Sequence, residues 1–226
     1  MHTTLAIDIG GSHVKIRIPG DPEKRRFQSG PTLTPSQMIQ GVRTLTAGWT
    51  FDSISIGLPA PIRNNRPVNN PVNLGPGWVD FDYDADFGLP TKLINDAAMQ
   101  AVGSYNGGRM LFLGFGTGLG SCLIVDHKIM PMELAHLPYR KGKTFEDYVG
   151  NRGLERLGKN RWCKHVAAVC NELFAALLPD EIVIGGGNLA HLGTLPDHCR
   201  AGDNANAFEG GFRLWHSDWA DAVPVY

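Results

Sequence analysis

The sequence predicts an α/β fold built from two units of related topology. A strand, a glycine turn and a second strand occur at residues 3–18, and the same pattern returns at residues 111–125. Each pattern is typical of a β-hairpin whose bend needs residues without a Cβ atom. Segments with apolar residues at helical spacing alternate with short apolar strands. We expect one domain of residues 1–108, completed by a C-terminal helix within residues 206–226, and a second domain of residues 109–205.

The composition of the 226 residues excludes several classes of protein. The formal net charge is −1, so no strong overall field points to nucleic acid or to a membrane surface. No run approaches the ~20 apolar residues of a membrane helix, and the N-terminus does not read as a signal peptide. The four cysteines form no C-x-x-C pair, which favours reduced thiols. We expect a cytoplasmic protein that binds small molecules, with no nucleic acid and no membrane partner.

The first hairpin carries an acid inside an apolar strand. Asp8 interrupts the strand Leu5–Ile9, and a glycine turn at residues 10–12 leads into a second strand that contains Lys15. Carboxylates are rarely buried unless they are paired or lie near a metal ion. Two glycine hairpins, one with an acid at its mouth, suggest the two walls of a site for a polyphosphate and its magnesium ion.

A helix and an asparagine-rich loop come next. Apolar residues at helical spacing predict a helix over residues 36–47, with Ser36 as its N-cap. Residues 63–78 contain five asparagines. One interpretation is a surface loop that uses Asn in turns. The other is a rim of amides for sugar hydroxyls, because an amide donates and accepts hydrogen bonds at once.

The pair Asn95-Asp96 stands at the end of a short strand predicted over residues 91–94. Asp is among the favoured N-cap residues, so Asp96 is expected to cap a helix over residues 97–105. A catalytic role for this carboxylate is the alternative. Two glycines, at positions 107 and 108, predict a flexible joint between the domains.

The second hairpin has the densest glycine pattern of the chain. Glycines recur at positions 114, 116, 118 and 120, with Thr117 at the tip. A glycine bend exposes backbone N–H groups, and successive N–H groups form a concave anion site. A plain hairpin with a glycine-rich turn is the alternative. The order GTGLG lacks the G-x-G-x-x-G spacing of dinucleotide-binding turns.

The part of the chain after residue 125 adds charged and glycine-rich segments. Glu133 and His136 are three residues apart and are expected to share one face of a helical turn. The segment from Arg140 to Lys164 contains eight basic and three acidic residues. Such an excess of positive charge is typical of a solvated surface or of a surface for a phosphate donor. A strand over residues 181–184 leads into three glycines and Asn188, where a flat ligand can approach the backbone. Two further helices are expected over residues 166–178 and 206–215.

Six short motifs occur in one order along the chain. They are DIGGSHVK (Asp8–Lys15), GLP (Gly57–Pro59), NDA (Asn95–Ala97), GFGTGLG (Gly114–Gly120), ELAH (Glu133–His136) and IGGGN (Ile184–Asn188). In this order they resemble the ROK (repressor, open reading frame, kinase) sugar kinases. That family has the two-domain ribonuclease-H-like fold of actin, hexokinase and Hsp70, with a cleft between the domains. The short chain without zinc cysteines is most similar to the polyphosphate glucokinase branch.

The resemblance implies phosphoryl transfer from ATP or polyphosphate, with Mg²⁺, to a hexose hydroxyl, most simply O6 of glucose. It implies that Asp96 is the general base. The sugar-binding residues it implies are Asn70, Asn95, Asp96, Glu133, His136 and Glu146. The phosphate- or nucleotide-binding residues it implies are Asp8, Gly10, Gly11, Ser12, Lys15, Gly116, Thr117, Gly118, Gly186, Gly187 and Asn188.

The metal and assembly expectations also follow from the resemblance. Asp8 would hold magnesium through water, since Mg²⁺ keeps several of its waters. In zinc-bearing members the His of the fifth motif is joined by three downstream cysteines, whereas residues 139–144 hold none. Tetrahedral zinc needs four ligands, so no zinc site is expected. By analogy with the family, a homodimer is implied.

Two other functions stay open at this point. One is a catalytically silent sugar-binding sensor of the same fold, and the other is a kinase strictly dependent on polyphosphate. Regulators of the family carry a DNA-binding segment ahead of the first motif. Only seven residues precede Asp8 here, which favours the kinase.

Overall fold

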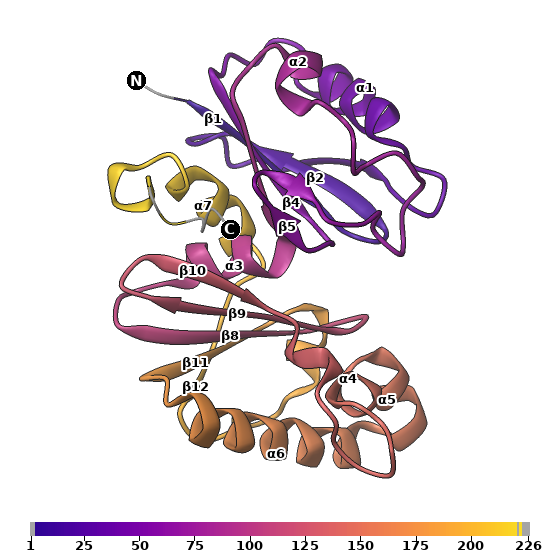
Figure 1. The fold of residues 1–226 in the computed structure, drawn as a ribbon, viewed down its shortest axis with the longest axis vertical. Helices are drawn as coiled ribbons and strands as arrows, with labels where there is room; N and C mark the ends of the chain where they lie inside the picture. Colours follow the sequence, from indigo (N-terminus) through magenta and orange to yellow (C-terminus); the bar gives the residue numbers. More distant parts are fainter. Residues whose placement is uncertain (1–2, 221, 223–226) are drawn as a thin grey trace.

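Two five-stranded mixed sheets organise the chain (Figure 1). The computed structural model describes residues 3–220 and residue 222. The first sheet has the strand order β3-β2-β1-β4-β7, and the second has the order β10-β9-β8-β11-β12. In both sheets three antiparallel strands continue into two parallel ones. The predicted α/β class and the related topology of the two halves are confirmed.

Each sheet takes its strands from one half of the sequence. The first sheet contains β1 (Thr4–Ile9), β2 (His13–Arg17), β3 (Arg25–Gln28), β4 (Ser53–Leu58) and β7 (Thr91–Asn95). The second contains β8 (Arg109–Phe115), β9 (Leu119–Val125), β10 (Lys128–Met132), β11 (Glu181–Gly185) and β12 (Cys199–Ala201). A small separate ribbon contains β5 (Ile62–Arg63) and β6 (Arg66–Pro67).

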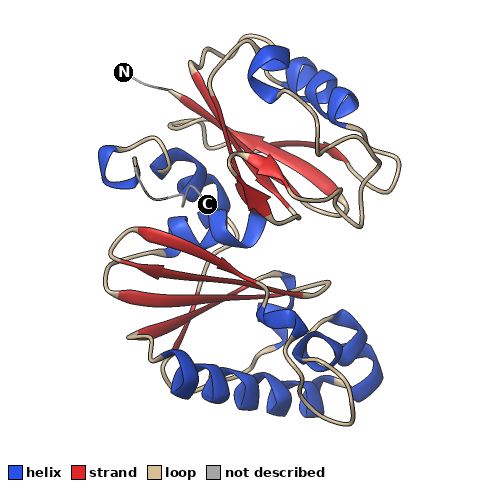
Figure 2. Cartoon of the chain, in the orientation of Figure 1, coloured by secondary structure: helices blue, strands red, loops and turns tan. Residues whose placement is uncertain are grey.

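Helices cover the outer faces of the sheets and fill the space between them (Figure 2). The helices are α1 (Pro35–Leu45), α2 (Tyr83–Phe87), α3 (Asp96–Ser104), α4 (Phe145–Val149), α5 (Asn151–Leu157), α6 (Lys159–Leu177) and α7 (Asn206–Arg213). Three 3₁₀ turns add η1 (Leu134–His136), η2 (Gly187–His191) and η3 (Ser217–Trp219). Helices α1 and α2 lie over the first sheet, α6 lies under the second, and α3 and α7 lie between the two sheets (Figure 1).

Both predicted hairpins are present, and each begins a sheet. In the first, Asp8 of β1 lies opposite Lys15 of β2 and beside Gly57 of β4. In the second, Gly114 of β8 lies opposite Gly120 of β9. The strands β1 and β8 are central in their sheets and their apolar side chains are buried, which explains why both sequences are nearly continuous apolar runs.

Several predicted helix ends were wrong by a few residues. Helix α1 is capped by Thr34, not Ser36, because the Thr34 hydroxyl accepts from the Gln37 N–H in a capping box and Pro35 takes the first helical position. Helix α6 begins at Lys159, before the predicted residue 166. Part of the predicted C-terminal segment, residues 221 and 223–226, lies outside the described residues.

Helices α3 and α7 cross with their backbones in contact, and glycines make the crossing possible. A Cβ atom at Gly103 of α3 would lie 1.9 Å from the carbonyl oxygen of Asn206, and one at Gly210 of α7 would lie 1.8 Å from that of Met99. On its other side α7 reaches the first sheet, where the Ser55 hydroxyl donates to the Gly211 carbonyl at 2.7 Å. The crossing therefore links the two halves of the molecule.

No helix within the described residues is long and apolar enough to cross a membrane.

The crossing predicts a large stability effect from a single methyl group. Gly103→Ala or Gly210→Ala should lower the free energy of unfolding by about 3 kcal/mol or more, because the added Cβ overlaps a helix backbone that cannot move aside. Urea unfolding measures this difference. Gly193→Ala is the matched control, since no atom lies within 4 Å of its Cβ position. Equal stability of the Gly103 and Gly193 variants would contradict the described crossing.

Candidate active site

The first turn of α3 is the place where strand ends from both sheets meet. A Cβ atom at Gly120, in β9, would lie 2.7 Å from the Cβ atom of Ala97. A Cβ atom at Gly57, in β4, would lie 3.4 Å from the Cα atom of Asp96. Two glycines thus let the second hairpin and the end of β4 approach the same helical turn, and Asp96 lies between them.

Asn95, rather than Asp96, caps helix α3, which corrects the expectation from the sequence. The Asn95 Oδ1 atom accepts from the N–H groups of Ala97 and Ala98 at 3.0 and 3.2 Å, and its Nδ2 atom donates to the Ala60 carbonyl at 3.3 Å. Asp96 is the first helical residue, and its carboxylate accepts from the N–H of Ala97 at 2.9 Å and from its own backbone N–H. Capping therefore does not account for Asp96, and Asn95 has a structural role with one N–H left for a ligand.

The Asp96 carboxyl group is perturbed in the way expected of a general base. Burial raises the pKa of Asp96 to about 6, and the negative charges of Asp8 and Glu133 act in the same direction. The N–H group of Ala97 lowers this pKa but does not reverse the shift. A strong perturbation by burial and by specific charges is typical of functional carboxylates. It also shows that Asp8, Asp96 and Glu133 share one electrostatic environment.

Asp8 lies at the end of β1 and is almost completely buried, with 6% of its surface exposed. Its Oδ2 atom accepts from the Lys15 Nζ atom at 3.0 Å, a contact that the β1–β2 register produces directly. The predicted proximity of Asp8 and Lys15 to one phosphate-binding turn is thus consistent with the geometry. Lys15 neutralises a carboxylate that would otherwise be costly to bury.

The donor set around Asp8 is suitable for magnesium but not for a metal held by protein alone. Mg²⁺ is commonly bound by one or two carboxylates, with water and substrate phosphates completing the shell. Within the described part of the chain, no group of three or more His, Cys, Asp or Glu side chains could hold a metal ion. A single hard carboxylate beside a glycine turn therefore fits magnesium that arrives with a phosphate donor.

The first glycine turn uses part of its hydrogen-bonding capacity within the turn. The Gly10 N–H group donates to the His13 carbonyl at 2.9 Å, so it is not available to a phosphate, contrary to the expectation. Among the described residues, the N–H groups of Gly11 and Ser12 have no hydrogen-bond acceptor. Ser29, which the sequence did not single out, holds this turn through its hydroxyl, which donates to the Gly10 carbonyl at 2.6 Å.

The tip of the second hairpin is held by the segment that joins α4 to α5. The Asn151 N–H group donates to the carbonyls of Gly116 and Thr117 at 2.9 and 3.3 Å. A Cβ atom at Gly150 would lie 2.9 Å from the Thr117 carbonyl oxygen. The Gly116 N–H donates within the turn to the Gly118 carbonyl at 3.1 Å, which removes it from the predicted phosphate cradle. In the described residues, the N–H groups of Thr117 and Gly118 have no acceptor.

The glycines that follow β11 lie beside the tip of the second hairpin. A Cβ atom at Gly186 would lie 2.3 Å from the Phe115 carbonyl oxygen, whereas no atom lies within 4 Å of the Cβ positions of Gly187 and Gly116. Asn188 is buried and its Nδ2 atom donates to the Asn151 Oδ1 atom at 2.7 Å and to the Gly116 carbonyl at 3.3 Å. Asn188 therefore shapes the loop instead of presenting its amide nitrogen to a nucleotide.

Glu133 and His136 are brought together as expected. Glu133 precedes the turn η1 and His136 ends it, and the Glu133 Oε2 atom lies 3.7 Å from the His136 Nε2 atom. Both side chains are exposed, so both can reach a ligand. The negative charge of Glu133 contributes to the raised pKa of Asp96, so this pair belongs to the same electrostatic environment as the candidate base.

Glu146 lies against the second hairpin. Its Oε2 atom would be 2.2 Å from a Cβ atom at Gly118, and its Oε1 atom lies 3.3 Å from a terminal nitrogen of Arg152. Glu146 is therefore positioned by the hairpin tip and by an exposed cation. Among the described residues, no hydrogen bond or ion pair joins Glu146 to Glu133 or to Asp96.

Asn70 is exposed and lies in the loop that follows β6. Its Oδ1 atom accepts from the Trp78 N–H at 2.9 Å, which fixes the carboxamide and leaves its nitrogen exposed. Asn73, from the same loop, lies over the first glycine turn, with its Nδ2 atom 3.8 Å from the Cβ position of Gly11.

Three of the residues that shape the site, Asn151, Gly150 and Ser29, were not predicted. Gly150 separates α4 from α5 and Asn151 is the first residue of α5, and this break in helical periodicity was the available signal. Ser29 lies in a polar segment of turns and offered none.

Comparison with known proteins supports this picture. No family model matches the chain. Its sequence is 27% identical over 212 residues to the polyphosphate glucokinase of Mycobacterium leprae, covering 82% of this chain and 64% of that protein. The chain thus spans less than two thirds of the length of this relative.

Solved structures match over nearly the whole chain. The inorganic polyphosphate/ATP-glucomannokinase of Arthrobacter sp. strain KM matches with a TM-score of 0.78 and 22% identity, covering 93% of this chain and 96% of that one. A ROK-family glucokinase of Streptomyces griseus, solved with glucose and AMPPNP, matches with a TM-score of 0.71 and 14% identity, covering 92% and 97%. The resemblance found in the motifs is confirmed: the chain has the fold of the ROK-family sugar kinases and is a distant relative of polyphosphate glucokinases.

Proposed function

We propose that the protein is a sugar kinase that transfers a phosphoryl group from ATP or polyphosphate to a hexose hydroxyl, with O6 of glucose as the first candidate. The observation that carries this proposal is Asp96. It is not needed as a helix cap, its pKa is raised to about 6, and it lies on the helical turn that the second glycine hairpin and the end of β4 both approach. The similarity to glucokinases that use these donors is consistent with the same chemistry.

In this proposal Asp96 orients the acceptor hydroxyl and takes its proton. A carboxylate with a pKa near 6 is a stronger base than an ordinary Asp and is still ionised at neutral pH. A sugar hydroxyl is far less acidic than a carboxylic acid, so the proton moves late, as the new bond to phosphorus forms. Phosphoryl transfer depends mainly on such positioning and on charge neutralisation.

The proposed sugar contacts come from both sides of the cleft. Glu133 and His136 are exposed and adjacent, and the remaining N–H of Asn95 points from the first turn of α3. Asn70 contributes an exposed amide nitrogen from the rim, and Glu146 contributes a carboxylate beside the hairpin tip. Together these groups offer both donors and acceptors, as recognition of a polyhydroxylated ring requires.

The proposed phosphate site uses the two glycine turns. The N–H groups of Gly11, Ser12, Thr117 and Gly118 are available, and Gly116 and Gly187 leave open space beside them. Asp8 would hold magnesium, which when bound supplies positive charge that offsets the charge on the phosphates. Lys15 is positioned to move from Asp8 to a phosphate oxygen once that charge is present, because its side chain is partly exposed.

ATP and polyphosphate are the two candidate phosphoryl donors, and one structural feature favours each. The open Gly187 after β11 leaves room for a flat nucleotide near the backbone. Helix α5 starts at the hairpin tip, and exposed cations follow from there along α5 and α6: Arg152, Arg156, Lys159, Arg161 and Lys164. Several exposed cations on two helices that follow the hairpin tip would suit a long polyanion. We take ATP as a usable donor and strict dependence on polyphosphate as the second candidate.

Asp96→Asn tests the general base with two readouts that move in opposite directions. Turnover should fall about 100- to 10,000-fold, because the amide cannot take a proton. Stability at neutral pH should instead rise by about 1–2 kcal/mol. The raised pKa means that Asp96 stabilises the fold only while protonated, and this contribution is lost as the pH rises through about 6. The gain of the variant should therefore vanish near pH 4.

Asp147→Asn provides the control for this pH dependence. Hydrogen bonds from Thr144 lower the pKa of Asp147, so its contribution to stability is present at neutral pH and is lost as the pH falls. This variant should be less stable than the parent protein at neutral pH. Thermal unfolding at several pH values and steady-state kinetics measure both effects. Turnover of Asp96→Asn close to that of the parent would remove Asp96 from the mechanism.

Gly116→Ala tests the phosphate site without disturbing the fold. No atom lies within 4 Å of the Cβ position of Gly116, so the melting temperature should not change. The methyl group would enter the space assigned to a phosphate, so the KM for the donor should rise at least about tenfold, with the sugar KM unchanged. Gly193→Ala should change neither constant. An unaltered donor KM would place the phosphates elsewhere.

Salt dependence separates the two donors. A polyanion bound by several cations should lose affinity steeply between about 50 and 200 mM salt, whereas a nucleotide held mainly by N–H groups should respond weakly. We expect ATP to support glucose phosphorylation with little salt dependence. Activity with polyphosphate alone, collapsing as salt rises, would favour the second candidate. In that case Lys159→Ala with Arg161→Ala should raise the donor KM, and Lys24→Ala, another exposed cation, should not.

A further inference from the structure

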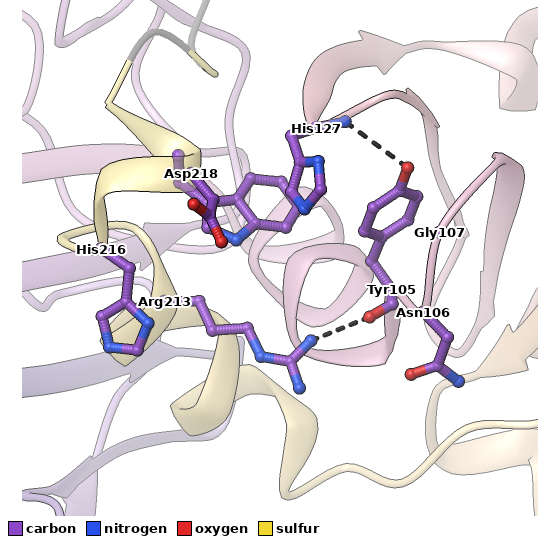
Figure 3. A pocket seen from close by; sticks show the side chains of 8 residues that line it. Tyr105, Asn106, Gly107, His127, Arg213, His216 and Asp218 are labelled. Carbon is purple, nitrogen blue, oxygen red and sulfur yellow. Dashed lines mark hydrogen bonds between the residues drawn. The ribbon is translucent and has the colours of Figure 1, made fainter.

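A cavity lies beside the predicted hinge, and its lining is separate from the candidate active site (Figure 3). Its volume is about 280 Å³. The described residues that line it are Tyr105, Asn106, Gly107, His127, Arg213, His216, Asp218 and Trp219. None of these belongs to the glycine turns or to the sugar-binding set proposed above.

Three parts of the chain meet in this cavity. Residues 105–107 are the end of α3 and the start of the joint between the sheets, His127 lies in the turn between β9 and β10, and Arg213 to Trp219 close the C-terminal side. The Tyr105 hydroxyl donates to the Gly108 carbonyl at 2.8 Å and accepts from the His127 N–H at 3.4 Å. The cavity therefore spans the predicted hinge.

The buried wall of the cavity is aromatic. Tyr105 and Trp219 are only 5% and 4% exposed. The His127 ring meets both of them edge to face, at centroid distances of 5.1 and 4.9 Å. Figure 3 shows the rings of Tyr105 and His127, with the polar side chains of Arg213, His216 and Asp218 on the same cavity. An aromatic wall with a polar rim is suited to a ligand that has both C–H faces and hydroxyl groups.

The rim offers hydrogen-bond donors and acceptors in similar number. The Nε atom of Arg213 donates to Glu209 and its Nη1 atom to the carbonyls of Val102 and Tyr105. Its Nη2 atom has no acceptor among the described residues. Asp218 offers a carboxylate, and its only described hydrogen bond comes from the Ser217 hydroxyl at 3.4 Å. A neutral imidazole has one ring nitrogen that donates and one that accepts a hydrogen bond, so His127 and His216 can each offer both.

The charge of the rim argues against a strongly charged ligand. Arg213 is the one cation and Asp218 the one carboxylate among the described lining residues, and Arg213 already pairs with Glu209 at 3.1 Å. A phosphate would meet no excess of positive charge, and a cation no excess of negative charge. The volume lies just below the ~300–1,000 Å³ of pockets for drug-sized ligands, so it suits a ligand the size of one sugar ring.

We propose that the hinge cavity is a binding site for a neutral monosaccharide, distinct from the acceptor site in the cleft. Arg213 and Asp218 would bind hydroxyl groups as donor and acceptor, His216 would close the outer side, and one face of the sugar ring would lie against the exposed His127 ring, which contacts Trp219 and Tyr105 edge to face. This proposal does not depend on kinase activity, because it concerns binding alone.

The test is an NMR titration of the full chain with ¹³C-labelled glucose in the absence of any phosphoryl donor. Intermolecular NOEs from the sugar to the rings of Trp219 and Tyr105 are expected, in addition to any NOEs to the His136 ring in the cleft. In the double variant His216→Ala with Asp218→Asn, sugar binding at the hinge should weaken about tenfold or more, because two hydrogen-bonding groups are lost. NOEs to His136 should persist with unchanged concentration dependence.

His191→Ala is the control, since this exposed histidine lies on η2, away from the cavity; it should leave hinge binding unchanged. Inorganic phosphate should not displace the sugar from the hinge. Absence of NOEs to Trp219 and Tyr105 at sugar concentrations well above saturation of the cleft would overturn the proposal. Displacement by phosphate would also overturn it, in favour of an anion site. Failure of glucose to bind in the cleft would affect only the proposed kinase function.

Discussion

The close crossing of α3 and α7 is the contact on which the rest of the structure depends. Each sheet buries one face against helices of its own, but only this helix pair lies between both sheets. Gly103 and Gly210 allow the two backbones to touch, and the Trp215 Nε1 atom donates to Ser55 of the first sheet at 2.9 Å. Since Asp96 is the first residue of α3, the orientation of the candidate base is set by packing that lies at the far end of the same helix.

The candidate site brings negative charge close to Asp96, and the fold limits the free-energy cost of this arrangement. Burial raises the pKa of Asp96, and the charges of Asp8 and Glu133 raise it further. Of these, Asp8 is neutralised by Lys15, and Glu133 is exposed and lies beside His136. Asp96 alone has neither a cation nor full access to water. The one destabilised carboxylate is thus the one whose reactivity the proposed chemistry requires, as expected where stability is given up for function.

Much of the fold could be predicted because its signals are local. Glycine bends between apolar runs identified both hairpins, and helical periodicity identified α1, α6 and α7. Details that depend on distant contacts could not be predicted. Asn95 and Asp96 are both good caps, and the choice of Asn95 follows from the approach of β4 and β9 to the first turn of α3. The start of α5 is held by carbonyls of the second hairpin, a contact that periodicity does not reveal. Asn188 was assigned to a ligand because nothing in its neighbours indicated Asn151 as its partner.

Two pairs of glycines in this protein would respond differently to mutation. Gly103 and Gly210 lie against helix backbone, so a mutation there weakens the fold and is opposed whatever the protein does. No atom lies within 4 Å of the Cβ positions of Gly116 and Gly187, so a mutation there leaves the packing unchanged and, under the proposed function, is opposed only while donor binding is under selection. If that selection relaxed, a lineage could lose the proposed donor site and keep a stable fold. Under the proposed function, the step from kinase to sugar sensor would therefore meet no barrier from folding.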